Sequence, residues 1–145
     1  MSLLTALRSG VCAHSAAAME ALGRGIVAEK FAQGGTLALR GDLGVGKTTL
    51  VRGMADALGV KSITSPSFNY YFIYNTGKTP LLHLDAYRLA TPADYTSLMI
   101  DEQLTPSTLF VIEWPEKLGD FLPKDAVTLE LKIVGEGIHE VKLIE

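Results

Sequence analysis

The first half of the chain alternates stretches of helical periodicity with short apolar runs. Residues 16–32 predict a helix that begins after Ser15, a residue type suited to an N-cap, and stops before two consecutive glycines. Residues 36–39 predict a short buried strand. A second helix is expected over residues 48–58, because apolar side chains recur there every four positions and Gly59 stands where a C′ glycine belongs.

The middle of the chain predicts three more strands. Residues 70–74 and 81–84 predict two strands joined by "NTGKTP", whose Asn and Gly favour a hairpin turn. Residues 108–112, "TLFVI", are almost wholly apolar. We therefore expect a third, buried strand that ends at Glu113.

The remaining patterns complete the predicted fold. Thr91 and Pro92 are suited to the N-cap and first position of a helix running towards Leu104. Apolar and polar residues then alternate over 127–133 and again, after a "GEG" turn, over 141–143, which predicts an antiparallel hairpin with one buried face. Helices alternating with buried strands, followed by hairpins, predict an α/β fold with a mixed, parallel plus antiparallel, sheet.

Length and composition predict a single domain over residues 1–145, large enough to bury a substantial core. The longest apolar runs fall far short of the ~20 residues that a membrane span needs. The N-terminal segment lacks the continuous apolar stretch of a signal peptide. One cysteine, Cys12, excludes an internal disulfide, fits a reducing compartment and is interpreted as a packed free thiol. We expect a cytoplasmic protein.

Charge is distributed unevenly along the chain. Residues 1–63 carry seven Lys and Arg against four acidic residues, whereas residues 64–145 carry six against twelve. An acidic second half argues against a broad nucleic-acid surface. Any role near RNA is therefore expected to be indirect, through a partner protein.

The stretch after the first predicted strand matches the phosphate-binding pattern G-x-x-x-x-G-K-[ST] in full. Glycines at these positions let backbone N–H groups surround an anion, and the following helix directs its positive N-terminus at the same point. The lysine supplies a cation for the β- and γ-phosphates, and the threonine hydroxyl is an oxygen ligand for Mg²⁺. The matching residues are Gly41, Asp42, Leu43, Gly44, Val45, Gly46, Lys47 and Thr48.

A P-loop also needs an acid at the end of another buried strand to complete its metal site. Glu113 is placed for that role, and Asp85, which follows "LLHL", is an alternative or additional acid. His83 is interpreted as a packed histidine rather than a ligand. Trp114, next to Glu113, is expected in the core or as a wall of the site. The guanine-reading Asn-Lys-x-Asp tetrad is missing from the sequence, which favours ATP.

Four motifs in order carry a family resemblance: "GDLGVGKTT" (41–49), "TSPSF" (64–68), "HLDAYR" (83–88) and "VIEWPE" (111–116). Together they resemble the TsaE (YjeE) family of small bacterial P-loop ATPases, required for making threonylcarbamoyladenosine in tRNA. The resemblance covers essentially the whole chain. It implies a three-layer, P-loop NTPase-like fold.

The resemblance also implies roles for individual residues. Residues Asp42 to Thr49 would surround the phosphates of ATP, and Thr48 and Glu113 would bind Mg²⁺. Asp85 would be an acid needed for hydrolysis, with Lys47 engaging the γ-phosphate and Trp114 acting beside the metal acid. The segment from 65 to 68 would form a switch-like loop near the γ-phosphate.

The implied partners are TsaD, which transfers the threonylcarbamoyl group, and its companion TsaB. The implied ATPase does not modify tRNA itself; its cycle resets the TsaB–TsaD complex. Slow turnover is expected, because no arginine is clearly placed to stabilise the transition state, although Arg88 is a candidate. The alternatives are a small-molecule P-loop kinase, which would normally carry an arginine-rich lid, and a structural module with a vestigial loop.

Two positions depart from the family pattern. Met19 stands where the family has a threonine, and Gly137-Ile138-His139-Glu140 replaces the usual Gly-Arg-Glu. Both regions are expected near the nucleotide base, so the base contacts are the part of the site that the resemblance leaves open. Residues 94–104 are also an atypical version of the crossover helix.

Overall fold

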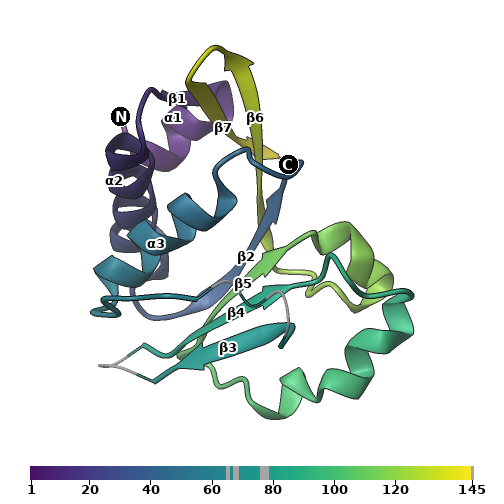
Figure 1. Cartoon of the computed structure of the whole chain (residues 1–145). Coiled ribbons are helices and arrows are strands. Elements are labelled where there is room, and N and C mark those ends of the chain that lie inside the picture. Colours follow the sequence, from purple (N-terminus) through teal and green to yellow (C-terminus); the bar gives the residue numbers. More distant parts are fainter. Residues whose placement is uncertain (65, 67–68, 76–78, 145) are drawn as a thin grey trace.

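The computed structural model describes residues 1–64, 66, 69–75 and 79–144, and contains one seven-stranded sheet (Figure 1). The strand order is β1-β7-β6-β2-β5-β4-β3. The four inner strands β6, β2, β5 and β4 pair in parallel, and the remaining pairs are antiparallel. The strands are β1 (Val11–Ala13), β2 (Gly35–Arg40), β3 (Tyr71–Tyr74), β4 (Leu81–Asp85), β5 (Leu109–Glu113), β6 (Val127–Gly135) and β7 (Ile138–Ile144).

Helices cover both faces of this sheet, so the predicted three-layer α/β fold with a mixed sheet is confirmed. One face packs against α2 (Ala16–Ile26) and α3 (Lys47–Ala57), and the other against short 3₁₀ segments. Successive residues of β5 alternate between the two cores, with Leu109 and Val111 in one and Phe110 and Ile112 in the other. The other helical segments are α1 (Leu3–Ser9), the π-helical η1 (Val27–Phe31), and the 3₁₀ segments η2 (Pro92–Leu98), η3 (Ile100–Glu102) and η4 (Pro115–Phe121).

The helices and strands of the first half follow the sequence pattern closely. The Ser15 hydroxyl accepts a hydrogen bond from the Ala18 N–H at 3.0 Å and so caps α2, which continues into η1. Gly59, at φ +84°, follows the end of α3 in the left-handed conformation expected of a C′ glycine. The hairpin of β3 and β4 is confirmed by their antiparallel pairing, although residues 76–78 of its turn lie outside the described residues.

The predicted helix from Pro92 to Leu104 is wrong in type, because it consists of two 3₁₀ segments separated by Met99 at φ 58°. Polar side chains bind the backbone here and compete with α-helical hydrogen bonds. The Asp94 carboxylate accepts from the N–H groups of Ala90 and Thr91, both at 3.0 Å. The Thr91 N-cap and the Pro92 start are nevertheless as predicted.

The edges of the sheet hold three further differences. The pattern missed α1 and β1, both too short for periodicity to show. Cys12 lies in β1 and is exposed rather than packed, because its side chain lies on the face opposite to that of the buried Ala13. The tail hairpin is confirmed, but Ile133 is 55% exposed, since β6 runs beyond its pairing with β2 and breaks register after Ile133.

Among the described residues, no helix is long and apolar enough to cross a membrane.

The crossing of α2 and α3 is close enough to require glycine. A Cβ atom added to Gly53 would lie 1.9 Å from the carbonyl oxygen of Glu20, and one added to Gly23 would lie 2.3 Å from that of Leu50. Both obstacles are backbone atoms, so the helices would have to separate. Because α3 begins at Lys47, this crossing fixes the position of the preceding glycine loop.

We therefore expect Gly53→Ala to lower the free energy of unfolding by about 2 to 3 kcal/mol, despite the higher helix propensity of alanine. Urea denaturation monitored by circular dichroism measures the change. Gly25→Ala is the matched control, because in α2 its Cβ would meet just the tip of the Leu3 side chain. Equal stability of the two variants would show that the crossing tolerates a methyl group.

Candidate functional site

The loop between β2 and α3 has the backbone shape of an anion cradle. Gly41, Gly44 and Gly46 take φ values of +151°, +81° and +108°, which side chains with a Cβ rarely adopt. A Cβ at Gly44 would meet no described atom within 4 Å, so the loop is open on that side. No side chain of the described residues caps α3 at Gly46, which leaves the first N–H groups of the helix for a ligand.

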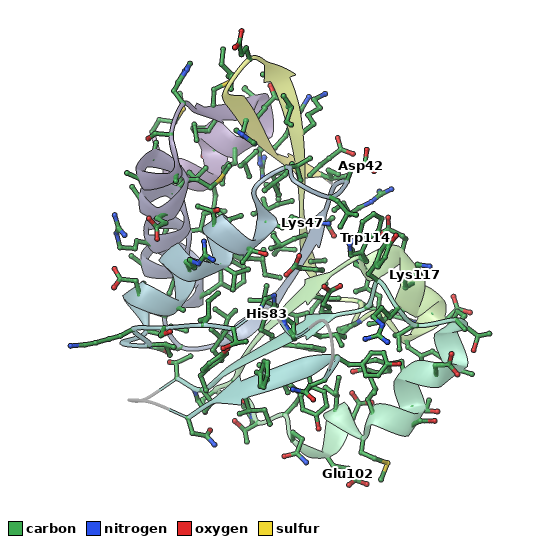
Figure 2. All side chains as sticks on the ribbon, in the orientation of Figure 1. Asp42, Lys47, His83, Glu102, Trp114 and Lys117 are labelled. Atoms are coloured by element: carbon green, nitrogen blue, oxygen red, sulfur yellow. The ribbon has the colours of Figure 1, made fainter. Side chains whose placement is uncertain are left out.

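Lys47 extends from the first turn of α3 back across this loop. It is 5% exposed, its ammonium group donates a hydrogen bond to the Gly41 carbonyl, and its Nζ lies 4.1 Å from the centre of the Trp114 ring (Figure 2). Burial lowers the pKa of Lys47, and the carboxylates of Glu113 and Asp85 oppose that shift. Among the described residues, the hydrogen-bond partner of this ammonium group is thus a carbonyl oxygen and not a carboxylate.

The two candidate acids lie side by side at the ends of adjacent parallel strands. Asp85 ends β4 and Glu113 ends β5, and the two are register partners. Both line a cavity of 310 Å³ together with Lys47, Thr48 and Trp114. The structure thus brings the predicted lysine, threonine and carboxylates around one space at the glycine loop.

Burial is the main influence on Asp85. It raises the pKa of the carboxyl group, Glu113 raises it further, and a hydrogen bond from the Tyr87 N–H to Oδ1, at 3.0 Å, acts in the opposite direction. A carboxylate with a raised pKa accepts a proton more readily than an exposed aspartate does.

His83 is a site residue whose contact the sequence interpretation missed. It is fully buried, as a packed histidine should be, but its Nε2 lies 2.5 Å from Oε2 of Glu113. The signal was in the strand pattern: His83 pairs with Val111, two residues before Glu113, so period two places the side chains of His83 and Glu113 on one face.

Trp114 forms a wall of the cavity, which is one of the two placements expected from the sequence. Its backbone is left-handed, with φ 58° and ψ 52°, which turns the chain sharply after β5 and directs the indole towards Lys47. On its outer side the indole packs against Tyr87, with ring centres 4.9 Å apart. The Lys47 ammonium thus lies against an aromatic surface that is itself supported from outside.

A second cavity, of 350 Å³, lies beside the same loop and contains the departures from the family pattern. Met19 and His139 both line it, and Nδ1 of His139 lies 2.7 Å from the Val45 carbonyl oxygen. Ile138 is not among the lining residues, whereas its neighbours Gly137 and His139 are. The two regions expected near the base are therefore brought together, from α2 and β7, next to Gly44 and Gly46.

The loop expected to act as a switch is described only in part. Ser65, Ser67 and Phe68 lie outside the described residues. At the start of the loop, the Thr64 N–H donates a hydrogen bond to the Tyr74 hydroxyl at 2.9 Å. Arg88, the candidate for charge stabilisation, lies 5.8 Å from the centre of the Tyr70 ring and is not among the described residues that line the 310 Å³ cavity.

The described residues contain no group of three or more His, Cys, Asp and Glu side chains that could hold a metal ion by themselves. Mg²⁺ usually keeps several waters and takes one or two protein oxygens together with substrate phosphates. Thr48 and Glu113 are the residues that could supply those oxygens in the 310 Å³ cavity. The donor set is therefore compatible with a hard divalent cation bound together with a phosphate ligand.

Comparison with known proteins gives consistent matches. The family model described as "Threonylcarbamoyl adenosine biosynthesis protein TsaE" matches residues 13–140. The TsaE protein of Treponema pallidum is 35% identical over 80% of this chain and 86% of its own length. That of Streptomyces coelicolor is 37% identical over 86% of both chains. A crystal structure of YdiB from Bacillus subtilis aligns with a TM-score of 0.73 and 26% identity, covering 92% of this chain and 82% of YdiB.

The parallel inner strands, the glycine loop after β2 and the helix that follows define an α/β protein of the P-loop-like class. Within that class the match extends over most of the chain and to several relatives above 30% identity. The chain belongs to the TsaE family, and its role accordingly lies in the biosynthesis of tRNA threonylcarbamoyladenosine.

The raised pKa of Asp85 predicts a pH-dependent cost to stability. The pKa of this carboxyl group is near 3.8 in the unfolded chain and higher in the folded protein. Between these two pKa values the folded state binds more protons than the unfolded state. The free energy of unfolding therefore falls as pH rises through that window. We expect Asp85→Asn, which keeps an acceptor for the Tyr87 N–H, to be more stable than the unsubstituted protein above the window. Urea unfolding across acidic to neutral pH measures the difference.

Asp120→Asn, which alters an exposed carboxylate outside the cavity, is the control for this comparison. The difference between Asp85→Asn and the unsubstituted protein should shrink as pH falls below the window. A difference that stayed constant with pH would contradict the burial argument.

Proposed function

We propose that this chain is a slow, Mg²⁺-dependent ATPase that drives turnover of the TsaB–TsaD complex in tRNA threonylcarbamoyladenosine biosynthesis. One observation carries the proposal: Lys47, Asp85 and Glu113 come from three different elements and line one cavity at the glycine loop. The absence of the guanine-reading tetrad from the sequence favours ATP over GTP.

In this proposal the loop and the start of α3 bind the phosphates. Backbone N–H groups from Asp42 to Thr49 surround the oxygens, and the Lys47 ammonium exchanges its contact with the Gly41 carbonyl for the β- and γ-phosphates. Burial favours this exchange, since a partly desolvated ammonium gains more from an anion than from a carbonyl. Trp114 limits the access of water to Lys47 from one side.

Thr48 and Glu113 would hold Mg²⁺ through their side-chain oxygens. When bound, the cation would supply positive charge that offsets the charge developing on the phosphates. Asp85 orients a water molecule and accepts its proton, a role that its raised pKa supports. The nucleotide base would occupy the 350 Å³ cavity, where the thioether of Met19 and the ring of His139 would supply contacts that the family threonine and arginine do not.

The proposed rate is slow, because no arginine of the described residues lines the phosphate cavity. TsaB and TsaD would raise that rate by completing the site or ordering it, and tRNA would be met only through that complex. The family membership supports this placement, since the relatives are named for the same biosynthesis.

Lys47→Ala should weaken ATP binding about 100-fold, because it removes charge-assisted contacts to the phosphates. MgATP at about 100 times its Kd should stabilise the unsubstituted protein by about 2.7 kcal/mol, and the variant should lose nearly all of this gain. Thermal unfolding with and without MgATP gives the comparison. Lys61→Ala, which changes an exposed lysine away from the loop, is the control and should behave like the unsubstituted protein. If MgATP stabilised Lys47→Ala as much as it stabilises the unsubstituted protein, the assignment of Lys47 would be refuted.

Asp85→Ala should still bind MgATP but hydrolyse it about 100-fold more slowly or worse, which is the loss expected for a missing proton acceptor. The unsubstituted protein should be accelerated when TsaB and TsaD are added. Phosphate release is measured for each protein alone and in the mixture. Turnover of about 10 s⁻¹ by the isolated protein, without stimulation, would contradict the proposed regulatory role.

A further inference from the structure

The contact between His83 and Glu113 is buried at both ends. His83 is 0% exposed and the Glu113 side chain 7% exposed, and the Nε2–Oε2 distance is 2.5 Å. On its other side, Nδ1 of His83 is buried and has no hydrogen-bond partner among the described residues. Every polar contact that the structure gives this imidazole is therefore directed at one carboxylate oxygen.

The missing partner at Nδ1 assigns the tautomer of His83. If Nδ1 carried the proton, a buried N–H would be left unsatisfied, which is rarer and more costly than an unsatisfied lone pair. With the proton on Nε2, the ring donates to Oε2 of Glu113 and Nδ1 keeps only a lone pair. The neutral Nε2–H tautomer is thus the form that the geometry favours.

Glu113 needs such a restraint because competing charges lie nearby. The Lys47 ammonium attracts it, and Glu113 is the largest favourable charge acting on that lysine. Asp85, its register partner on β4, repels it. Without a fixed donor, the attraction of Lys47 and the repulsion of Asp85 would set the orientation of the carboxylate.

We propose that His83 is a positioning residue that fixes the Glu113 carboxylate through Oε2 and leaves Oε1 for the divalent cation. This inference rests on the proposed function, because it assigns the orientation of the acid that would hold Mg²⁺. His83 touches neither the nucleotide nor the metal in this arrangement. Its effect is on the affinity of the site for the cation, since partners that orient a ligating group typically change metal affinity 10- to 100-fold.

The first test needs no ligand. In ¹⁵N-labelled protein, two-bond ¹H–¹⁵N correlations of the imidazole ring distinguish the Nε2–H tautomer from the Nδ1–H tautomer, and His83→Gln identifies which signals belong to His83. We expect a single Nε2–H form in the nucleotide-free protein. An Nδ1–H form of His83, or averaging between the two forms, would overturn the inference.

The second test separates metal affinity from nucleotide affinity. Mn²⁺ binding to the ATP complex is followed by electron paramagnetic resonance, and ATP affinity is measured separately in the presence of chelator. His83→Leu should lower Mn²⁺ affinity 10- to 100-fold while changing metal-free ATP affinity less than about twofold. His83→Gln should restore most of the Mn²⁺ affinity, because its amide can place an N–H donor near the position of Nε2.

Val111→Ala is the matched control, since it removes bulk from the same face of β5 two residues before Glu113 and leaves the hydrogen bond in place. It should retain the Mn²⁺ affinity of the unsubstituted protein. Folded His83→Leu with unchanged Mn²⁺ affinity would overturn this inference alone. An unsubstituted protein that binds no Mn²⁺ATP would overturn the proposed function, and this inference with it.

Discussion

The parallel pairing of β5 with both β2 and β4 is the constraint on which the site depends. It aligns Leu39, Glu113 and Asp85 in one row across the sheet. The glycine loop leaves β2 just beyond that row, so the carboxylates and the loop meet at a single edge. A shift of one residue in either pairing would move an acid to the opposite face of the sheet. The backbone hydrogen bonds between these strands therefore determine which side chains come together at this edge of the sheet.

The site also concentrates polar groups that a protein interior does not normally accept. Lys47, His83 and Glu113 are among the few buried polar or charged residues described: Lys47 and Glu113 line the cavity, and His83 contacts Glu113. The Lys47 ammonium contacts the Gly41 carbonyl, and the His83 imidazole contacts the Glu113 carboxylate. Lys47 forms no direct ion pair with Asp85 or Glu113 in the described part of the chain. Such incomplete compensation costs stability and leaves binding capacity for a ligand.

Much of the fold could be predicted because its local signals agree with its tertiary structure. β5 is apolar on both faces, and the apolar residues of α3 recur with helical periodicity. The glycines of the loop stand at positions where the backbone has a positive φ. Residues 92–104 could not be predicted as 3₁₀ segments, because Asp94 and Thr96 bond to the local backbone in ways that periodicity does not reveal. The lysine, threonine and carboxylates that line the cavity could be selected as candidates by residue type and spacing. The bond between His83 and Glu113 required the strand register, which a single sequence supplies only once the parallel pairing is known.

The order of the strands has a consequence for how the molecule meets other proteins. The sheet is bounded by its two shortest strands, β1 with three residues and β3 with four. Short edge strands offer few free N–H and C=O groups to an incoming chain, so they discourage recognition by strand addition. A partner of this protein would accordingly recognise side chains and surface shape, with the sheet itself kept out of the interface.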